Sequence, residues 1–372
     1  MESCDVLKQR MYVLAAVVVM MSASVSQGMM FRGLGDFADG GFFSTASAVS
    51  ADGSTVVGWS RGTGGDKAFR WTFGGGMVEL GGIGQGQGRS FATAVSADGS
   101  VIVGGARRNG ENGTSDEAFR WTAEEGMVSI SQEWQSADTY ATAVSANGLI
   151  VAGRENWNFA FCYINGAISR AGGIFSDSVE TRITGISADG LTMTGYSLSE
   201  TGYTACMWKN GQATLLGANY GNYATAISGN GSVIVGGMDS EFSTEAFRWT
   251  AVGGMVGLGK PAGAETGMES SANAVSEDGS IVAGKYGGRA FIWDEANGMQ
   301  DLKEMLEKNL GMNLTGWILT SATGISSNGR TIVGNGINPE GFEEAWIVTM
   351  PEPATIGLLA LGMAFIAGKK KQ

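Results

Sequence analysis

Apolar and polar residues alternate in short runs along this chain, and the runs are separated by turns that contain glycine. Residues 91–96, FATAVS, form one alternating run, which is the period of a strand with one buried face. The β-branched run SVIVGG follows at 100–105, then EAFRWT at 117–122 and GMVSI at 126–130. Short runs between turn signals predict four strands that pair as successive hairpins.

The whole pattern occurs seven times. An Asp or Asn in the phrase AVSADGS marks each copy, and successive copies are 41 to 50 residues apart. These residues are Asp52, Asp98, Asn147, Asp189, Asn230, Asp278 and Asn328. Asp-Gly and Asn-Gly between β-rich runs predict a type I′ hairpin turn, with positive φ at both central residues. Four strands in each unit predict an all-β fold, a seven-bladed β-propeller of four-stranded repeats.

The third strand of each unit carries AFRW or a variant of it. We expect its large aromatic side chains to fill the space between neighbouring units. Arg70, Arg120 and Arg248 take one position of this motif that is apolar in the other four units, so we expect packed stems with heads directed outward or toward a carboxylate. A shared glycan-binding role for these arginines is the alternative. The third and fourth units depart most, with Tyr163 for Trp and Cys206 for Phe.

The ends of the repeat region predict how a ring closes. The seventh unit lacks the closing strand that reads GMVELGG from Gly76, and a similar piece, GMMFRGLGD, stands alone from Gly28. We therefore expect the N-terminal strand to complete the last blade, within a propeller at residues 27–350. This arrangement also protects sheet edges from aggregation.

One segment between the sixth and seventh units has helical rather than strand periodicity. Leu302, Met305, Leu306 and Leu310 are spaced i, i+3, i+4 and i+8, and Gly311 follows. This spacing predicts a short amphipathic helix that ends at the glycine and packs on the rim. A helix that binds a partner is the alternative.

Composition and charge limit the kinds of catalytic and binding site that this chain can contain. The chain has no His, which excludes Ser-His-Asp and Cys-His nucleophiles and His-based zinc sites. The net charge of −12 is spread along the sequence, which argues against a nucleic-acid partner. GWSRG at 58–62 matches a nucleophile elbow in form only, and we interpret Ser60 as a surface residue. Acidic residues are scattered in loops and are interpreted as solvated surface; they are Asp66, Asp116, Glu117, Asp177, Asp239, Glu241 and Glu245.

Little in the sequence indicates a metal site or a disulfide. The turn acids Asp52, Asp98, Asp189 and Asp278 could be proposed as calcium ligands. Hairpin chemistry explains them without a metal, because three copies have Asn instead, and we predict no metal and no cofactor. We also predict no disulfide between Cys162 and Cys206, which occupy adjacent motif positions that face opposite sides of a strand.

The two termini have the layout of targeting segments. Lys8 and Arg10 precede an apolar run and small residues, which predicts a secretory signal peptide over residues 1–26, with an uncleaved anchor as the alternative. At the other end, Pro351, Glu352 and Pro353 precede an apolar stretch at 354–368. A basic cluster then ends the chain, with Lys369, Lys370 and Lys371.

Residues 351–372 resemble the PEP-CTERM sorting signal of Gram-negative bacteria. The resemblance implies export, transient retention in the inner membrane and processing by an exosortase, often in bacteria that make exopolysaccharide. An ordinary C-terminal membrane anchor is the alternative.

The repeats themselves, AVSADGSVIVGG, AFRWT and GMVSI, resemble the HAF repeats of bacterial extracellular proteins, over roughly residues 31–353. That resemblance implies a secreted or cell-surface location and carries no established activity.

Taken together, these patterns predict an exported, non-catalytic repeat protein that acts as a surface or exopolysaccharide-matrix module. The alternative is a carbohydrate-active enzyme, a lyase or hydrolase that uses loop carboxylates, Tyr or Arg. Acids or tyrosines gathered at one mouth of the channel would favour the enzyme, and an exposed aromatic platform without acids would favour binding. Trp134 and Trp157, which stand in variable loops, are the first candidates for such a platform.

Overall fold

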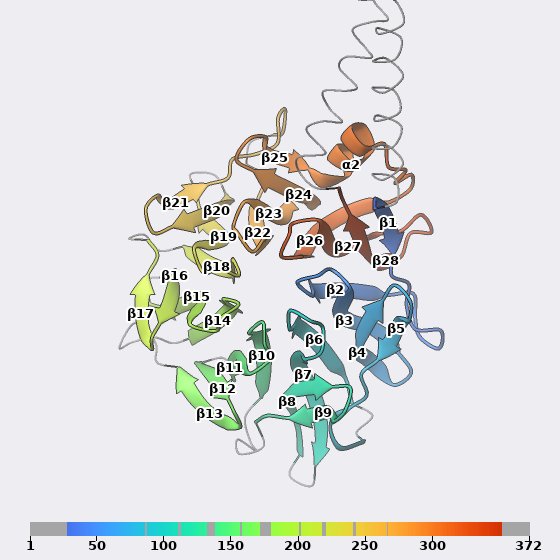
Figure 1. Cartoon of the computed structure of the whole chain (residues 1–372), viewed down its shortest axis with the longest axis vertical. Coiled ribbons are helices and arrows are strands. Elements are labelled where there is room, and N and C mark those ends of the chain that lie inside the picture. Colours follow the sequence, from blue (N-terminus) through green and yellow to red (C-terminus); the bar gives the residue numbers. More distant parts are fainter. Residues whose placement is uncertain are drawn as a thin grey trace, which may run out of the picture.

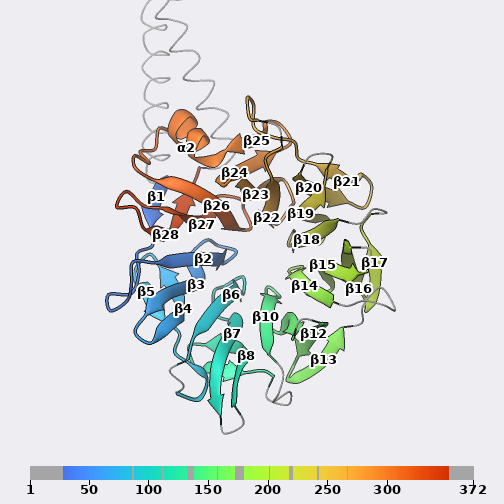
Figure 2. The same cartoon turned by 180° about the vertical axis from the view of Figure 1, so that it is seen from behind.

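The protein is a ring of seven four-stranded antiparallel sheets (Figures 1 and 2). The computed structural model describes residues 28–85, 88–110, 113–131, 138–156, 158–171, 180–200, 202–217, 221–240, 243–265 and 267–351. The first strand of six blades and β26 of the seventh lie nearest the centre of the ring, as both views show. The prediction of a seven-bladed β-propeller is therefore confirmed.

The first four blades follow one another in chain order. Blade 1 is β2 (Ser44–Val49), β3 (Thr55–Gly62), β4 (Gly65–Thr72) and β5 (Gly76–Glu79), followed by the 3-10 turn η1 (Ile83–Gln85). Blade 2 is β6 (Ser90–Val95), β7 (Ile102–Gly110), β8 (Gly113–Thr122) and β9 (Gly126–Ser129). Blade 3 is β10 (Thr139–Val144), β11 (Ile150–Glu155), β12 (Phe159–Ile164) and β13 (Ala167–Ala171). Blade 4 is β14 (Glu180–Ile186), β15 (Thr192–Ser199), β16 (Gly202–Lys209) and β17 (Gln212–Leu215).

The remaining blades complete the ring. Blade 5 is β18 (Asn222–Ile227), β19 (Val233–Asp239), β20 (Thr244–Thr250) and β21 (Gly254–Gly257). Blade 6 is β22 (Ser270–Val275), β23 (Ile281–Tyr286), β24 (Arg289–Asp294) and β25 (Gly298–Asp301), and the helix α2 (Leu302–Leu310) follows it. Blade 7 is β26 (Ile318–Ile325), β27 (Thr331–Ile337), β28 (Glu343–Thr349) and, from the other end of the chain, β1 (Met30–Gly33).

The N-terminal strand closes the ring as predicted. β1 pairs antiparallel with β28, from Met30 opposite Thr349 to Gly33 opposite Trp346. The backbone N–H of Leu34 then donates to the carbonyl of Ala345 at 2.8 Å. Because this strand takes the outermost place of blade 7, the last sheet depends on both ends of the chain.

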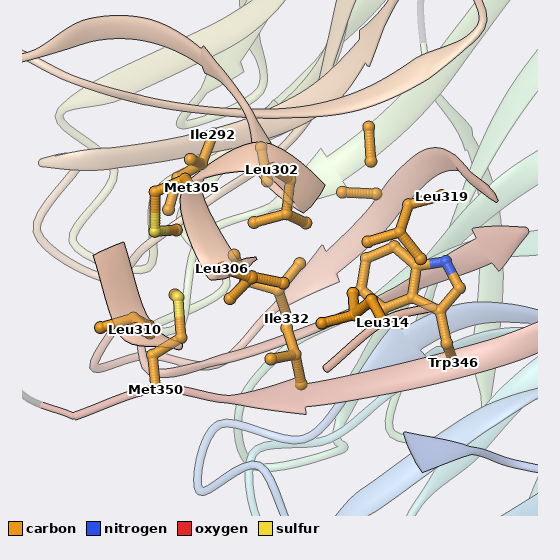
Figure 3. Packing of buried hydrophobic residues seen from close by; sticks show 14 residues of the cluster. Ile292, Leu302, Met305, Leu306, Leu310, Leu314, Leu319, Ile332, Trp346 and Met350 are labelled. Atoms are coloured by element: carbon orange, nitrogen blue, oxygen red, sulfur yellow. The ribbon is translucent and has the colours of Figure 1, made fainter. Parts of the chain in front are cut away.

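The helix predicted between the sixth and seventh units is present. All four stripe residues, Leu302, Met305, Leu306 and Leu310, are buried in the seam between blades 6 and 7, where Figure 3 shows them beside Ile332 and Trp346. Gly311 ends the helix with φ +67°, and its N–H donates to the carbonyl of Leu306. The stripe is a packing surface, so the alternative of a partner-binding stripe is wrong for these four side chains.

The hydrophobic core lies between the blades. The Phe of the third-strand motif is fully buried at Phe69, Phe119, Phe161, Phe247 and Phe291, and Trp346 takes its place in blade 7. Phe119, for example, packs against side chains of blade 1 as well as its own blade. The expectation that these aromatics fill the space between units is confirmed.

Ser60 is buried, so its interpretation as a surface residue is wrong. The strand β3 continues to Gly62, which places Ser60 inside the sheet rather than in a loop. Its hydroxyl donates to the backbone carbonyl of Phe43 at 2.8 Å, so it has a structural role.

The repeated hairpin turn differs from the predicted type. In blade 1 the N–H of Gly53 donates to the carbonyl of Ser50, and Gly53 has φ +79°. Among the described residues the only non-glycine residues with positive φ are Asn156, Asn165 and Asn210, so the type I′ prediction is wrong. The turn is instead a four-residue loop, in which two residues of negative φ precede one left-handed glycine and the Ser50 N–H donates to the Thr55 carbonyl.

The turn Asp or Asn acts as a local acceptor. Asp52 Oδ1 accepts from the Ser50 hydroxyl at 2.6 Å and from the Ser54 N–H at 2.9 Å. Asn147 makes the same two bonds with its amide oxygen, which explains why Asp and Asn alternate in the repeat. Hydrogen bonds from Ser100 and Ser96 lower the pKa of Asp98 to about 2.

The same turns join the blades into a closed ring of backbone hydrogen bonds at 2.8–3.1 Å. Donor and acceptor residues are Ala51 to Ala97, Ala97 to Ala146, Ala146 to Ala188, Ala188 to Gly229, Asn230 to Glu277, Glu277 to Ser327, and Ser327 back to Ala51. We call the end of the channel formed by these turns the hairpin end, and the opposite end the mouth.

Candidate binding site at the channel mouth

The hairpin end is lined by small side chains and by the backbone ring. A cavity of about 160 Å³ lies here, with Ala, Gly, Ser, Val and Ile around it. Glu277 is its only charged lining residue, and the carboxylate lies so close to Gly229 that a Cβ there would overlap it. Because the polar backbone groups of this ring bond to each other, the hairpin end serves to close the ring.

At the mouth, each blade carries a different pair of residues. One residue near the start of each innermost strand pairs with one residue near the end of the second strand, and together these seven pairs form what we call the mouth layer. The pairs are Thr45 with Trp59, Phe91 with Gly105, Tyr140 with Arg154, Arg182 with Tyr196, Tyr223 with Gly237, Ser271 with Lys285, and Ser321 with Asn335.

Aromatic side chains dominate this layer. Trp59, Phe91, Tyr140, Tyr196 and Tyr223 are all half-buried, so each presents part of a ring to solvent. They meet across the seams between blades: the Trp59 and Phe91 ring centroids lie 5.3 Å apart, and those of Tyr196 and Tyr223 lie 6.4 Å apart. Tyr203, which is exposed, adds a third ring 5.3 Å from Tyr196. Such edge-to-face contacts hold the rings in place.

A second aromatic pair stands at the mouth between blades 7 and 1. Phe42 precedes β2 and Phe342 precedes β28, and their rings stack with centroids 4.6 Å apart. Their exposed fractions are 68% and 40%. Exposed, stacked rings without an apolar cover are a platform on which the face of a sugar ring can lie.

A buried carboxylate fixes the position of Tyr140. Asp116, in β8, accepts a hydrogen bond from Arg89 at 2.5 Å, lies 3.3 Å from Arg107 Nε and accepts a further bond from the Tyr140 hydroxyl. Burial raises the pKa of Asp116, but the bonds from Arg89 and Tyr140 lower it by more, so the carboxyl stays ionised. Burial and the bond to Asp116 in turn raise the pKa of Tyr140 to about 12.

Two arginines complete the layer in blades 3 and 4. The Arg154 guanidinium lies over the Tyr140 ring, 4.2 Å from its centroid, and Arg182 lies over Tyr196 at 5.9 Å. Arg182 also forms an ion pair with Glu180. Burial lowers the pKa of Arg154, and the neighbouring charge of Arg182 lowers it further. The mouth therefore combines ring faces with guanidinium groups, which suits a ligand with apolar faces and polar or anionic edges.

A hollow of about 190 Å³ also opens between blades 5 and 6, lined by residues that include Glu245, Lys260 and Tyr286. Its polar groups are bonded to the loop that borders it. The Tyr286 hydroxyl donates to the Glu265 carbonyl at 2.9 Å, and the Gly259 N–H donates to Glu245 at 3.0 Å. The polar groups of the hollow therefore serve to hold this loop in place.

The structure describes some of the candidate residues named from the sequence and not others. Trp134 and Trp157, the predicted platform, lie outside the described residues, as do Asp177, Glu241, Glu352, Pro353 and the three terminal lysines. Asp116 and Glu117 are buried, so their interpretation as solvated surface is wrong, and both form ion pairs with arginines. Cys162 and Cys206 are free thiols in the structure.

The three motif arginines pack as expected. Each is half-buried. Arg120 reaches the Glu125 carboxylate at 3.2 Å, while Arg248 donates to the Gly279 carbonyl and Arg70 to the Thr55 hydroxyl. None of the three belongs to the mouth layer.

Sequence reasoning missed the mouth layer, although a signal for it exists. The position before the first-strand motif is Phe91, Tyr140 and Tyr223 in the three copies that read Ala-Thr-Ala, and Arg182 in the copy that reads Ile-Thr-Gly. A position that varies among aromatic, basic and small polar side chains beside a recurring motif has no shared structural role, and it marks a surface of variable chemistry.

Comparisons with known proteins agree with the fold and with one terminal motif. Residues 351–371 match the PEP-CTERM protein-sorting motif. The match confirms the predicted sorting signal and indicates an exported cell-surface protein of a Gram-negative bacterium that an exosortase processes. No curated protein sequence matches the chain.

Three solved structures resemble the chain at low identity. U3-55K is 13% identical, with a TM-score of 0.50 over 86% of this chain and 98% of that one. The β-propeller domain of Cps50 (Swd1) from Myceliophteria thermophila is 11% identical, with a TM-score of 0.48 over 82% and 96%. TolB from Acinetobacter baumannii is 15% identical, with a TM-score of 0.44 over 68% of this chain and 65%, just under two thirds, of TolB. At 13% identity the likeness to U3-55K shows the fold alone.

The described residues contain neither a metal-ion cluster nor a candidate membrane span. No three His, Cys, Asp or Glu side chains of the described ranges gather where they could hold a metal ion. In the same part of the chain, no helix has the length and apolar character that a membrane span requires.

Proposed function

We propose that this protein is an exported, non-catalytic module that binds exopolysaccharide at the cell surface or in its matrix. The observation that carries the proposal is the mouth layer, where five half-buried aromatic side chains and two arginines surround one end of the channel. Aromatic faces and guanidinium edges are the groups that bind sugar rings and their polar substituents. The resemblance of the repeats to HAF repeats belongs to the same proposal.

The protonation state of the mouth tyrosines supports binding without catalysis. A general base must lose its proton near the working pH, and tyrosine has to be shifted downward to do so. Burial and the bond to Asp116 shift Tyr140 in the other direction, to a pKa of about 12. Burial also raises the pKa of Tyr196. Both side chains therefore keep their protons at neutral pH and act as hydrogen-bond donors.

The location of the protein agrees with a polysaccharide ligand. A PEP-CTERM signal directs a chain to the cell surface, where exopolysaccharide is the abundant polymer of bacteria that make it. A surface protein with stacked aromatics on one face, and with an ordered structural ring on the other, is suited to hold such a polymer.

A carbohydrate-active enzyme is the second candidate, and one observation favours it. Tyr140, Asp116 and Arg154 lie together at the mouth, as expected for a site that uses tyrosine and arginine. An enzyme of this kind would use Arg154 to hold the substrate and the Tyr140 hydroxyl to donate a hydrogen bond to a sugar oxygen. No described residue of the mouth layer carries a carboxylate, and Asp116 is occupied by Arg89 and Tyr140.

The test is to incubate the protein with a panel of acidic and neutral bacterial exopolysaccharides. Retention in affinity electrophoresis measures binding, and a reducing-end assay together with absorbance at the wavelength of unsaturated uronates measures cleavage. We expect retention without new ends. New ends released at a saturable rate, and lost in Tyr140→Phe, would replace the proposal with the enzyme.

A further inference from the structure

The seam between blades 3 and 4 is unlike the other seams of the mouth. At three seams, the mouth-layer residue of one second strand meets the mouth-layer residue of the next innermost strand. Trp59 meets Phe91 and Tyr196 meets Tyr223 as ring pairs, and the Tyr140 ring covers Gly105. At the seam between blades 3 and 4 the equivalent residues are Arg154 and Arg182, and their strands β11 and β14 are in contact.

Two cations facing each other in a partly buried seam carry an electrostatic cost. Burial lowers the pKa of Arg154, and the charge of Arg182 lowers it further, as expected for two neighbouring guanidinium groups. Arginine side chains in proteins carry a positive charge. Glu180 forms an ion pair with Arg182, and Nη1 of Arg154 donates to the Asn156 carbonyl at 2.9 Å.

The tyrosines beside the two arginines hold them in place. Arg154 lies on the face of Tyr140, whose hydroxyl is fixed by Asp116, and Arg182 lies over Tyr196. A guanidinium stacked on a ring presents its N–H edge sideways, which is the geometry that pairs with a carboxylate or sulfate.

The charged residues of the whole mouth layer are all basic. Arg154, Arg182 and Lys285 are its charged members, and no acidic residue occupies any of the fourteen positions. The protein as a whole has 36 acidic and 24 basic residues. A cationic layer in an acidic protein concentrates anionic ligands at this end of the channel.

We propose that the seam between Arg154 and Arg182 binds the carboxylate or sulfate group of an acidic polysaccharide, while Tyr140 and Tyr196 support the sugar rings on either side. This inference rests on the proposed function and specifies its ligand class. The anion neutralises the repulsion between the two guanidinium groups, so binding selects charged over neutral polymers.

The test compares polygalacturonate with its methyl ester, which has the same backbone without the charges. The full chain, purified in mild detergent, is titrated with each polymer by calorimetry at low and high salt. We expect polygalacturonate to bind at least tenfold more tightly than the ester, and salt to remove the difference. Arg154→Gln and Arg182→Gln should each weaken binding to polygalacturonate about tenfold, as expected for one charge-assisted bond.

The control is Arg248→Gln, which removes the same charge outside the mouth layer. Thermal unfolding of each variant separates lost binding from lost folding. Equal affinity for the two polymers would overturn the acidic-ligand inference and leave the proposed function standing. Failure to bind either of these polymers or any polymer of the exopolysaccharide panel would overturn the proposed function itself.

A separate observation concerns how the ring faces the membrane. Strands β1 and β28 are antiparallel, so Met30 and Thr349 lie opposite each other at the hairpin end of blade 7. The Met350 N–H donates to the Arg330 carbonyl at 2.7 Å, and Arg330 Nε donates back to the Met350 carbonyl. The chain thus enters and leaves the ring beside one hairpin turn.

From this placement we infer that a membrane-held chain turns its hairpin end toward the bilayer and its mouth away from it. Pro351 is buried at that end, and the apolar stretch begins at Ala354, three residues later. Three residues span roughly 10 Å at most, which is too short a tether for the ring to turn over. The mouth layer then faces the polymer outside the cell surface.

The test uses the full chain in phosphatidylcholine vesicles that contain a lipid with a quencher on its headgroup. A fluorophore is attached to Ser54→Cys, at the hairpin end, or to Glu340→Cys, at the mouth; both native residues are exposed. As a control, the chain without either substitution is treated with the same fluorophore, which measures how much label the native cysteines take up. We expect strong quenching at position 54 and weak quenching at 340, and the reverse order or equal quenching would overturn the inference.

Discussion

The hairpin end and the mouth are built by the same seven sheets and follow opposite rules. At the hairpin end each blade supplies the same Ser, Asp or Asn, and Gly, and each turn bonds to the next. At the mouth the equivalent pair is different in each blade, from Thr45 with Trp59 to Ser321 with Asn335. Repetition marks the groups that every unit needs in order to join its neighbours, and variation marks a surface whose chemistry is free to serve a ligand.

The repeated glycine gives the largest expected effect. Gly99 has φ +72°, and a Cβ would lie 2.5 Å from the Thr55 hydroxyl of the preceding blade. We expect Gly99→Ala to lower the free energy of unfolding by about 3 kcal/mol, since left-handed backbone strain costs ~1–2 and overpacking ~1–3 kcal/mol. Gly288, in a mouth turn, has φ +79° and open space, so Gly288→Ala should show the strain alone. Equal losses in denaturant unfolding would contradict the packing role of the hairpin end.

The carboxylate behind the mouth gives the next largest effect. Asp116→Asn removes the charge that Arg89 and Tyr140 share, and we expect a loss of about 1.5–3 kcal/mol of unfolding free energy at neutral pH. Asp66 pairs with the exposed Arg61 at 3.7 Å near the end of the β3–β4 hairpin, so Asp66→Asn should cost less than about 0.5 kcal/mol.

The pH dependence of the Asp116 variant follows from its charge. Its folded-state pKa lies below 3.8, so the stabilisation is present above that pH and is lost as the pH falls through the folded value. The difference between wild type and Asp116→Asn in thermal unfolding should therefore shrink in acid. A constant difference would assign the effect to shape instead of charge.

One aromatic ring at each end of the channel allows the effect on binding to be separated from the effect on stability. We expect Tyr196→Ala to reduce polysaccharide binding about tenfold, the effect of losing a central contact, while stability falls by about 1 kcal/mol. Phe73 is an exposed ring at the hairpin end, 4.9 Å from Trp71, and Phe73→Ala should leave binding unchanged. If both substitutions reduced binding in affinity electrophoresis, the mouth would not be the binding surface.

The turn acid gives the smallest effect. The pKa of Asp98, about 2, lies below the ordinary 3.8, so its contribution is present above pH 3.8 and fades toward pH 2. Because the carboxylate is exposed, we expect Asp98→Asn to change stability at neutral pH by only about 0.5 kcal/mol or less. Acid unfolding curves should show a slightly shallower pH dependence for the variant, and a loss of several kcal/mol would contradict the local-acceptor role.

Most of the fold could be predicted because its signals are local and repeated. The period of the Asp and Asn residues gave the number of blades, and the unmatched strand at Gly28 gave the closure. The i, i+3, i+4 pattern gave α2 and its buried face. The turn type was wrong because Asp-Gly admits several hairpin geometries, and Ser60 was misplaced because a five-residue motif does not show how far a strand extends.

The mouth could not be predicted, because it joins residues from different repeats. Arg154 and Arg182 stand in different strands of different blades, and their approach depends on the register of both sheets and on the angle between blades. Asp116 illustrates the same limit: its sequence context resembles a polar loop, yet two arginines and Tyr140 surround it in a buried position.

The sequence by itself determined that this is a seven-unit β ring with a sorting tail, since hairpin pairing, strand alternation and the terminal motif are set by residues close together in the chain. Only the tertiary structure decided which end of the ring brings variable aromatic and arginine side chains together. Side chains about 30 residues apart meet at the mouth because each blade packs its face against the next, and no local pattern records that contact.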